Sequence, residues 1–103
     1  MTEDVLRSLI VSCHFAETKE IMIINHTKCA MLTFTDKELA AELREETGKS
    51  PVAPERFYAF TDLEENLRQQ IVKLRSHPWI PENLPVRGFI FDVDTGKLAE
   101  VDA

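Results

Sequence analysis

Residues 20–25 read EIMIIN, and HTKC follows at once at residues 26–29. The first run is apolar at positions that point to both faces of a strand, which is typical of a strand covered by helices on both sides. The chain then becomes polar and must turn. An imidazole, His26, and a thiol, Cys29, therefore follow the carboxyl end of the strand, where open α/β sheets place ligands and reactive groups.

Two helices are predicted around this strand. Thr2 is suited to cap a first helix, whose apolar residues recur at helical spacing as far as about His14. Thr35 and Glu38 have the spacing of a capping box and predict the start of a second helix. Gly48 is a natural stop for that helix, because glycine readily adopts the left-handed backbone of a helix end.

The second half of the chain predicts one helix and two strands. Residues 47–58 contain two prolines and no clear period, so we expect a surface loop there. Thr61 opens a third helix with a second capping box, and Pro78 ends it. Residues 86–92 read as a strand, and residues 98–101 as a strand returning after the turn-forming sequence DTG. The expected buried face of the third helix consists of Leu63, Leu67, Ile71 and Leu74.

The order of these elements predicts an α/β fold in one domain, residues 1–103. A strand joined to a later strand through helices makes a parallel crossover, and the last two strands make an antiparallel hairpin. A length of 103 residues is enough for a single hydrophobic core. No internal repeat or low-complexity tract interrupts the chain.

Composition and charge exclude several classes of function. With 44% hydrophobic and 29% charged residues the chain has the composition of an ordinary globular protein. A formal net charge of -6 disfavours nucleic acid and anionic membranes as partners. The first residues lack the features of a signal peptide, and no apolar segment is long enough to span a membrane. With only two cysteines, we expect reduced thiols in the cytoplasm.

His26 and Cys29 have the spacing of a zinc-binding pair but do not make a complete site. Zinc needs four ligands, or three and an open position. The remaining soft ligands are Cys13, His14 and His77. Each is predicted at a helix end, where a solvated surface role is the simpler interpretation. On spacing alone, a polar loop without metal therefore remains the alternative.

Six stretches occur in an order found in one known family. RSLIVS lies at residues 7–12, TKEIMII at 18–24 and HTKCAM at 26–31. FTDLE follows at 60–64, SHP at 76–78 and VRGFIFDVDTGKL at 86–98. Together they resemble the β-class carbonic anhydrases over essentially the whole chain.

The resemblance implies a fold, a metal and a reaction. The fold is a truncated form of the family's three-layer α/β architecture, with a short parallel sheet and a C-terminal antiparallel hairpin. His26 and Cys29 match zinc ligands of the family. The family reaction is the reversible hydration of CO2 to bicarbonate by zinc-activated water.

The chain also departs from the family pattern. The family has an earlier strand ending in C-x-D-x-R, which provides a third ligand and an Asp-Arg pair, and neither cysteine of this chain begins that motif. Ala30 replaces a glycine beside the metal, and Lys28 puts a positive charge there. Glu17 stands where the family has glycine, so a left-handed backbone would carry a side chain. The resemblance therefore implies half of a zinc site.

Three interpretations of function follow from this departure. The chain is a carbonic anhydrase-like protein that is catalytically defective alone, one half of a split zinc enzyme completed by another chain, or a non-catalytic module that binds zinc between subunits. In the family the missing strand lies beside the one ending at His26, so residues 21–24 should form an open edge. We expect two copies to associate through this strand or through the first helix, as a homodimer or other homo-oligomer.

Overall fold

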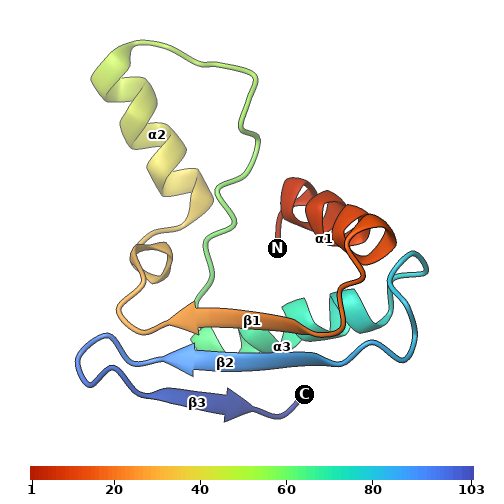
Figure 1. The fold of residues 1–103 in the computed structure, drawn as a ribbon. Coiled ribbons are helices and arrows are strands. Elements are labelled where there is room, and N and C mark those ends of the chain that lie inside the picture. The colour runs from red at the N-terminus through yellow and green to blue at the C-terminus, as the bar shows by residue number, and fades with distance from the viewer. The chain divides into compact units, whose positions relative to one another are not determined.

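The computed structural model describes all 103 residues. The chain forms two compact units. One unit consists of Met1–Thr27 and Leu63–Ala103, and the other of Lys28–Asp62. The elements in chain order are α1 (Glu3–Phe15), β1 (Ile21–His26), the short 3-10 helix η1 (Ala30–Leu32), α2 (Asp36–Thr47), α3 (Leu63–Arg75), β2 (Val86–Phe91) and β3 (Leu98–Val101), as Figure 1 shows.

The first unit contains a three-stranded sheet in the order β1-β2-β3. β1 runs parallel to β2, with Ile21 opposite Val86 and His26 opposite Phe91. β3 returns antiparallel to β2. The predicted α/β class, the parallel crossover and the C-terminal hairpin are therefore confirmed. No helix of the chain has the length and apolar character needed to cross a membrane.

The core of this unit lies between one face of the sheet and α3. Leu67, Ile71 and Leu74 of α3 have no exposed surface, as expected from the spacing of apolar residues along this helix. They pack close to the sheet because β2 carries Gly88 at this point. A Cβ atom on Gly88 would lie only 2.3 Å from Cδ1 of Ile71. Side chains of α1 pack against the same core, but none of its residues is fully buried.

Only one face of β1 is covered within this chain. Ile21 and Ile23 point into the core and are 5% and 9% exposed. Met22 and Ile24 point to the other face and are 50% and 53% exposed. The expectation of helices on both sides of this strand was therefore wrong for the chain as it stands.

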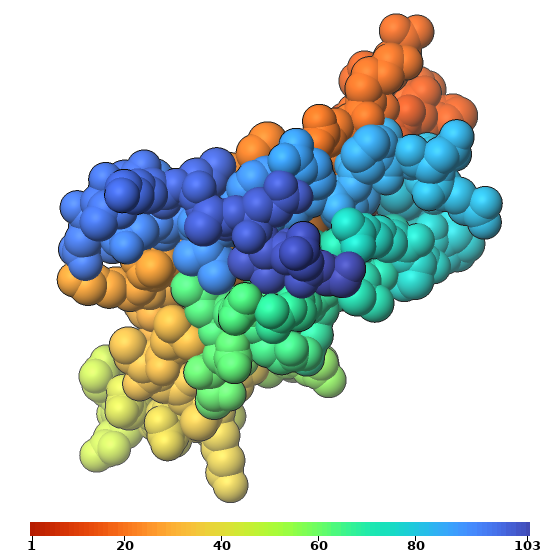
Figure 2. Space-filling model, turned by 90° about the horizontal axis from the view of Figure 1, so that it is seen from below, coloured from red at the N-terminus to blue at the C-terminus, as the bar shows by residue number.

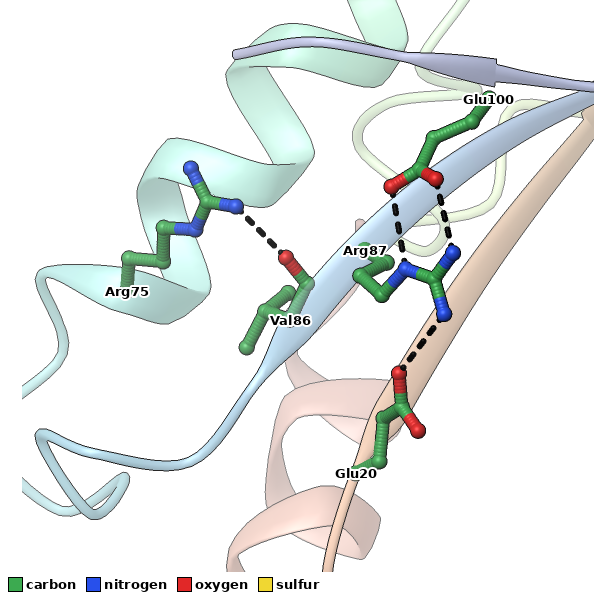
Figure 3. Close-up of polar contacts among 5 residues, drawn as sticks. All are labelled: Glu20, Arg75, Val86, Arg87 and Glu100. Atoms are coloured by element: carbon green, nitrogen blue, oxygen red, sulfur yellow. Dashed lines mark hydrogen bonds and ion pairs between the residues drawn. The ribbon is translucent and has the colours of Figure 1, made fainter.

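Charged side chains on the open face join β2 to β3 and to Glu20, the residue before β1. The Arg87 guanidinium lies 2.7 Å from one Glu100 oxygen and 3.3 Å from Glu20, as Figure 3 shows. Hydrogen bonding to Arg87 lowers the pKa of the Glu100 carboxyl, and the two carboxylates raise the pKa of Arg87. Because these side chains are exposed, the pairs align the strands more than they stabilise the fold.

The C-terminal segment is held against α3. Arg68 donates to the Asp102 carbonyl at 3.2 Å and Arg75 to that of Ala103 at 3.1 Å. Figure 2 shows this dark blue segment beside the green α3. Arg75 also donates to the Val86 carbonyl at 2.7 Å (Figure 3) and so ties the end of α3 to the start of β2.

The second unit is built around α2 and a loop tied to its first residue. The predicted capping box is present, with Glu38 N–H donating to the Thr35 hydroxyl and Thr35 N–H to the Glu38 carboxylate. Gly48 ends the helix with a left-handed backbone at φ 66°. The Asp36 carboxylate accepts three backbone N–H bonds of 2.9 to 3.3 Å from residues 57–59. The bond from Ala59 contributes most to lowering the pKa of Asp36.

Helix boundaries differ from the prediction by one or two residues. α1 continues to Phe15, and α3 begins at Leu63, so Asp62 rather than Thr61 precedes its first residue. Both Thr and Asp are common N-caps, so the local pattern does not distinguish them. Glu17 adopts φ 52°, which confirms the left-handed backbone expected there.

Candidate metal centre

His26 is the last residue of β1, and its ring is exposed. Its Nδ1 atom lies 2.8 Å from the carbonyl oxygen of Thr27. A carbonyl oxygen can only accept a hydrogen bond, so this contact favours the tautomer with the proton on Nδ1. The lone pair on Nε2 is then available for a metal. A backbone carbonyl that orients the imidazole is a common support of zinc-binding histidines.

Thr27 fixes the backbone beside His26 to the end of β2. Its N–H donates to the Phe91 carbonyl at 3.0 Å, and its hydroxyl accepts from the Val93 N–H at 3.1 Å. The carbonyl that orients His26 therefore belongs to a residue held at two points. Sequence reasoning did not predict this role for Thr27, although a hydroxyl residue directly after a strand is a signal for such side chain to backbone bonds.

A second polar contact fixes β1 from the side of α3. The Asn25 side chain donates to Gln70 at 2.9 Å and accepts from Asn66 at 3.0 Å. All three side chains are partly buried. Sequence reasoning also missed this network, for which the available signal is a carboxamide on the core face of an otherwise apolar strand.

Cys29 belongs to the other unit, where it precedes η1. Its carbonyl accepts from the Leu32 N–H at 3.1 Å, and its thiol is free and partly buried. Lys28, the first residue of this unit, has φ 53°. A left-handed residue ends an extended strand, so the chain turns directly after the strand that carries His26.

The other soft ligands of the chain lie outside β1 and the turn that follows it. Cys13 and His14 line a shallow cavity of about 340 Å³ near the end of α1. The Nδ1 atom of His77 accepts from the Trp79 N–H at 3.1 Å, and its ring lies against Trp79. The chain contains no group of three or more His, Cys, Asp or Glu side chains that could hold a metal ion. The donor types of His26 and Cys29 suit zinc, but their number is too small for a complete site.

Comparisons with known proteins identify relatives along the whole chain, although no family model matches it. Beta-carbonic anhydrase 1 of Mycobacterium tuberculosis is 41% identical over 102 residues, which are 98% of this chain and 61% of that protein. A carbon disulfide hydrolase of Acidithiobacillus thiooxidans is 32% identical over 114 residues, covering 95% of this chain and 57% of that protein.

Solved structures give the same result for the fold. A carbonic anhydrase from Streptococcus mutans superimposes with a TM-score of 0.91 at 39% identity, covering 99% of this chain and 61% of that one. An apo carbon disulfide hydrolase gives a TM-score of 0.85 at 29% identity over 96% of this chain and 60% of that one. The chain thus spans about three-fifths of the length of these relatives.

Proposed function

Since the chain belongs to the β-carbonic anhydrase family, as a partial member, we propose that it carries half of the metal centre for the zinc-dependent, reversible hydration of CO2 to bicarbonate. His26 and Cys29 are the two zinc ligands of this half. Zinc, when bound, supplies a Lewis acid that activates water at neutral pH. The contribution of these residues is to hold an imidazole and a thiolate at the end of β1.

The contact between His26 and the Thr27 carbonyl carries this proposal. It leaves Nε2 as the free ligand atom, and Thr27 is itself fixed to the backbone of Phe91 and Val93. A ligand whose ring is oriented before the metal arrives loses less conformational entropy on binding. The similarity of sequence and fold to carbonic anhydrases supports the same assignment.

We propose further that these 103 residues are catalytically defective alone, because they contain no C-x-D-x-R sequence. Two ligands bind zinc far more weakly than three or four. Two alternatives keep the same residues in the same role. The chain is then one half of a split enzyme completed by another chain, or a non-catalytic module that binds zinc between subunits. In each case we propose a single domain, a cytoplasmic location and a homo-oligomer.

Metal analysis and activity separate these possibilities. The purified chain is dialysed against zinc, and its bound metal is measured beside the variants His26→Ala and Cys29→Ser. Cys13→Ser and His77→Ala are matched controls, since they remove the same donor types elsewhere. Weak zinc binding that is lost in the first two variants and kept in the controls supports the assignment. Equal zinc binding in all variants contradicts it.

Hydration of CO2 is then measured with the chain alone and after addition of a polypeptide that carries the C-x-D-x-R segment of a family member. We expect no turnover by the chain alone, and activity restored on mixing supports the split enzyme. Half an equivalent of zinc per chain without activity supports the module. Carbon disulfide serves as a second substrate, because relatives include carbon disulfide hydrolases.

A further inference from the structure

Asn25 is a polar residue on the face of β1 that is otherwise apolar. Ile21 and Ile23 share this face and are 5% and 9% exposed. The next inward position belongs to Asn25, directly before the candidate ligand His26. A carboxamide inside a fold is costly unless its polar groups are paired. The inward position nearest to His26 is therefore polar where burial alone would favour an apolar residue.

Two carboxamides of α3 pair with Asn25. Asn25 Nδ2 donates to Gln70 Oε1 at 2.9 Å, and Asn25 Oδ1 accepts from Asn66 Nδ2 at 3.0 Å. Asn66 and Gln70 are four residues apart, so they lie one turn apart on the same face of the helix. We call the three side chains the carboxamide network. A shift of α3 by one residue along β1 would break its bonds, so the network fixes the position of the strand relative to the helix.

The backbone of His26 is held through its two neighbours. Ile21 donates its N–H to Pro85, and Thr27 donates to Phe91. Odd-numbered residues of β1 therefore direct their N–H and C=O groups toward β2, and His26 directs its own groups away from β2. The position of His26 relative to β2 thus depends on the residues before and after it.

We infer that the carboxamide network positions His26, so that its imidazole keeps the bond to the Thr27 carbonyl and presents Nε2 to a metal. Thr27 fixes this part of the chain to β2, and Asn25 fixes it to α3. His26 lies between these two points of attachment. The inference rests on the proposed role of His26 as a zinc ligand, but the state of its ring can be measured without metal.

Hydrogen bonds suit this role better than apolar contacts do. An apolar side chain at position 25 would fill the same space without setting a direction, whereas a hydrogen bond weakens steeply when its distance or angle changes. The unfolded chain makes equivalent bonds to water, so the network adds little to stability. Its main effect is a defined arrangement of β1 and α3.

The tautomer of His26 reports the state of its ring. Isotope-labelled histidine is observed by NMR at about pH 8.5, where an ordinary imidazole is neutral. The chain has three histidines, and the signals of His26 are those lost in His26→Ala. We expect the proton of His26 on Nδ1, because this atom faces the Thr27 carbonyl. His77 should carry its proton on Nε2, since its Nδ1 accepts from the backbone N–H of Trp79, and it serves as an internal reference.

Two variants at position 70 of α3 test the network. Gln70→Glu keeps an oxygen that accepts from Asn25, whereas Gln70→Met has a similar length and no comparable acceptor. The tautomer of His26 should remain that of the wild type in Gln70→Glu and become a mixture in Gln70→Met. The tautomer of His77 should be the same in both variants.

A triple variant separates positioning from stability. Asn25→Leu, Asn66→Leu and Gln70→Met together replace the network by apolar side chains of similar size. Because no carboxamide is left unpaired, the midpoint of urea unfolding should stay near that of the wild type. We expect a mixed tautomer at His26 in this folded variant. Its zinc affinity should be roughly tenfold lower than that of the wild type, an effect usual for groups that support metal ligands.

The outcomes distinguish this inference from the proposed function. A proton on Nε2 of His26 in the wild type would overturn the inference. An unchanged tautomer in both Gln70→Met and the triple variant would also overturn it and leave the network a purely structural role. A wild type that binds no zinc through His26 would refute the proposed function, while the expected change of tautomer would still support the positioning.

Discussion

Replacing Gly88 by alanine should destabilise the first unit through a clash at one contact. The added Cβ would lie 2.3 Å from Cδ1 and 3.1 Å from Cγ1 of Ile71, and 3.0 Å from Cδ1 of Leu67. Both side chains have no exposed surface, so a displaced methyl group would have to move within the packed core. Overpacking of this kind costs about 1 to 3 kcal/mol. We expect the upper part of that range, because the closest approach is well below a normal contact.

A second variant, Ile71→Val, removes the Cδ1 atom that would clash most closely with an alanine at position 88. Alone it should cost about 0.5 to 1.5 kcal/mol by leaving a small cavity. Combined with Gly88→Ala it should cost at least about 1 kcal/mol less than the sum of the two single changes. Gly48→Ala is the matched control. Gly48 has a φ of 66°, and a Cβ added there would meet no atom within 4 Å, so an alanine would strain the backbone without a clash. The loss of stability from Gly48→Ala should therefore simply add to the loss from Ile71→Val.

Urea unfolding of the three single variants, the two double variants with Ile71→Val and the wild type, all at one protein concentration, measures these free energies. The midpoint, with an unchanged slope, reports the loss of stability. Additive costs for Gly88→Ala and Ile71→Val would refute the reasoning. A cost of Gly88→Ala below that of Gly48→Ala would show that α3 moves away from the sheet freely.

Three further changes test other contacts. Asn25→Ala leaves its carboxamide partners on α3 unpaired and should lower the free energy of unfolding by about 1 to 2 kcal/mol, whereas a loss near zero would show that water replaces it. Asp36→Asn should speed amide hydrogen exchange at residues 57–59. Backbone N–H groups lower the pKa of Asp36 below its ordinary value of 3.8. The stabilisation of the fold by the Asp36 carboxylate is therefore fully present above pH 3.8 and is lost as the pH falls through the lowered pKa. Arg87→Met should lower the melting temperature slightly at low salt and not at high salt. In acid the wild type should lose the stabilisation that comes from the pair of Arg87 and Glu100, because the pKa of Glu100 is also lowered and its carboxylate is protonated only below that value.

Local patterns in the sequence predicted most of the fold. The capping box of Thr35 and Glu38 and the strand at 98–101 are confirmed, because each depends on residues close together in the chain. The start of α3 was misplaced, since Thr61 and Asp62 both carry a capping side chain. The exposure of Met22 and Ile24 could not be predicted either, because an apolar residue has the same sequence pattern whether or not another element covers it.

The candidate site likewise has features that the local sequence predicts and features that it does not. His26 and Cys29 could be selected from their residue types and spacing after a strand. The way in which Thr27 supports His26 could not be predicted from the sequence, because it depends on a hydrogen bond from Val93 to Thr27, and these two residues are 66 positions apart. The network of Asn25 likewise depends on a helix 45 positions away. Such contacts depend on the strand pairing of the complete fold and are absent from any short window of sequence.

The long separation between β1 and its partner also affects how the chain is made. A ribosome adds roughly 5 to 20 residues per second, so β2 follows β1 after roughly 3 to 13 s. During that time the edge of EIMIIN that later pairs with β2 has no partner. Loop closure over this distance must precede any stabilisation from strand pairing, which makes folding slow. Synthesis rate and chaperone supply should therefore influence the yield of folded protein more than they do for helical proteins of this length.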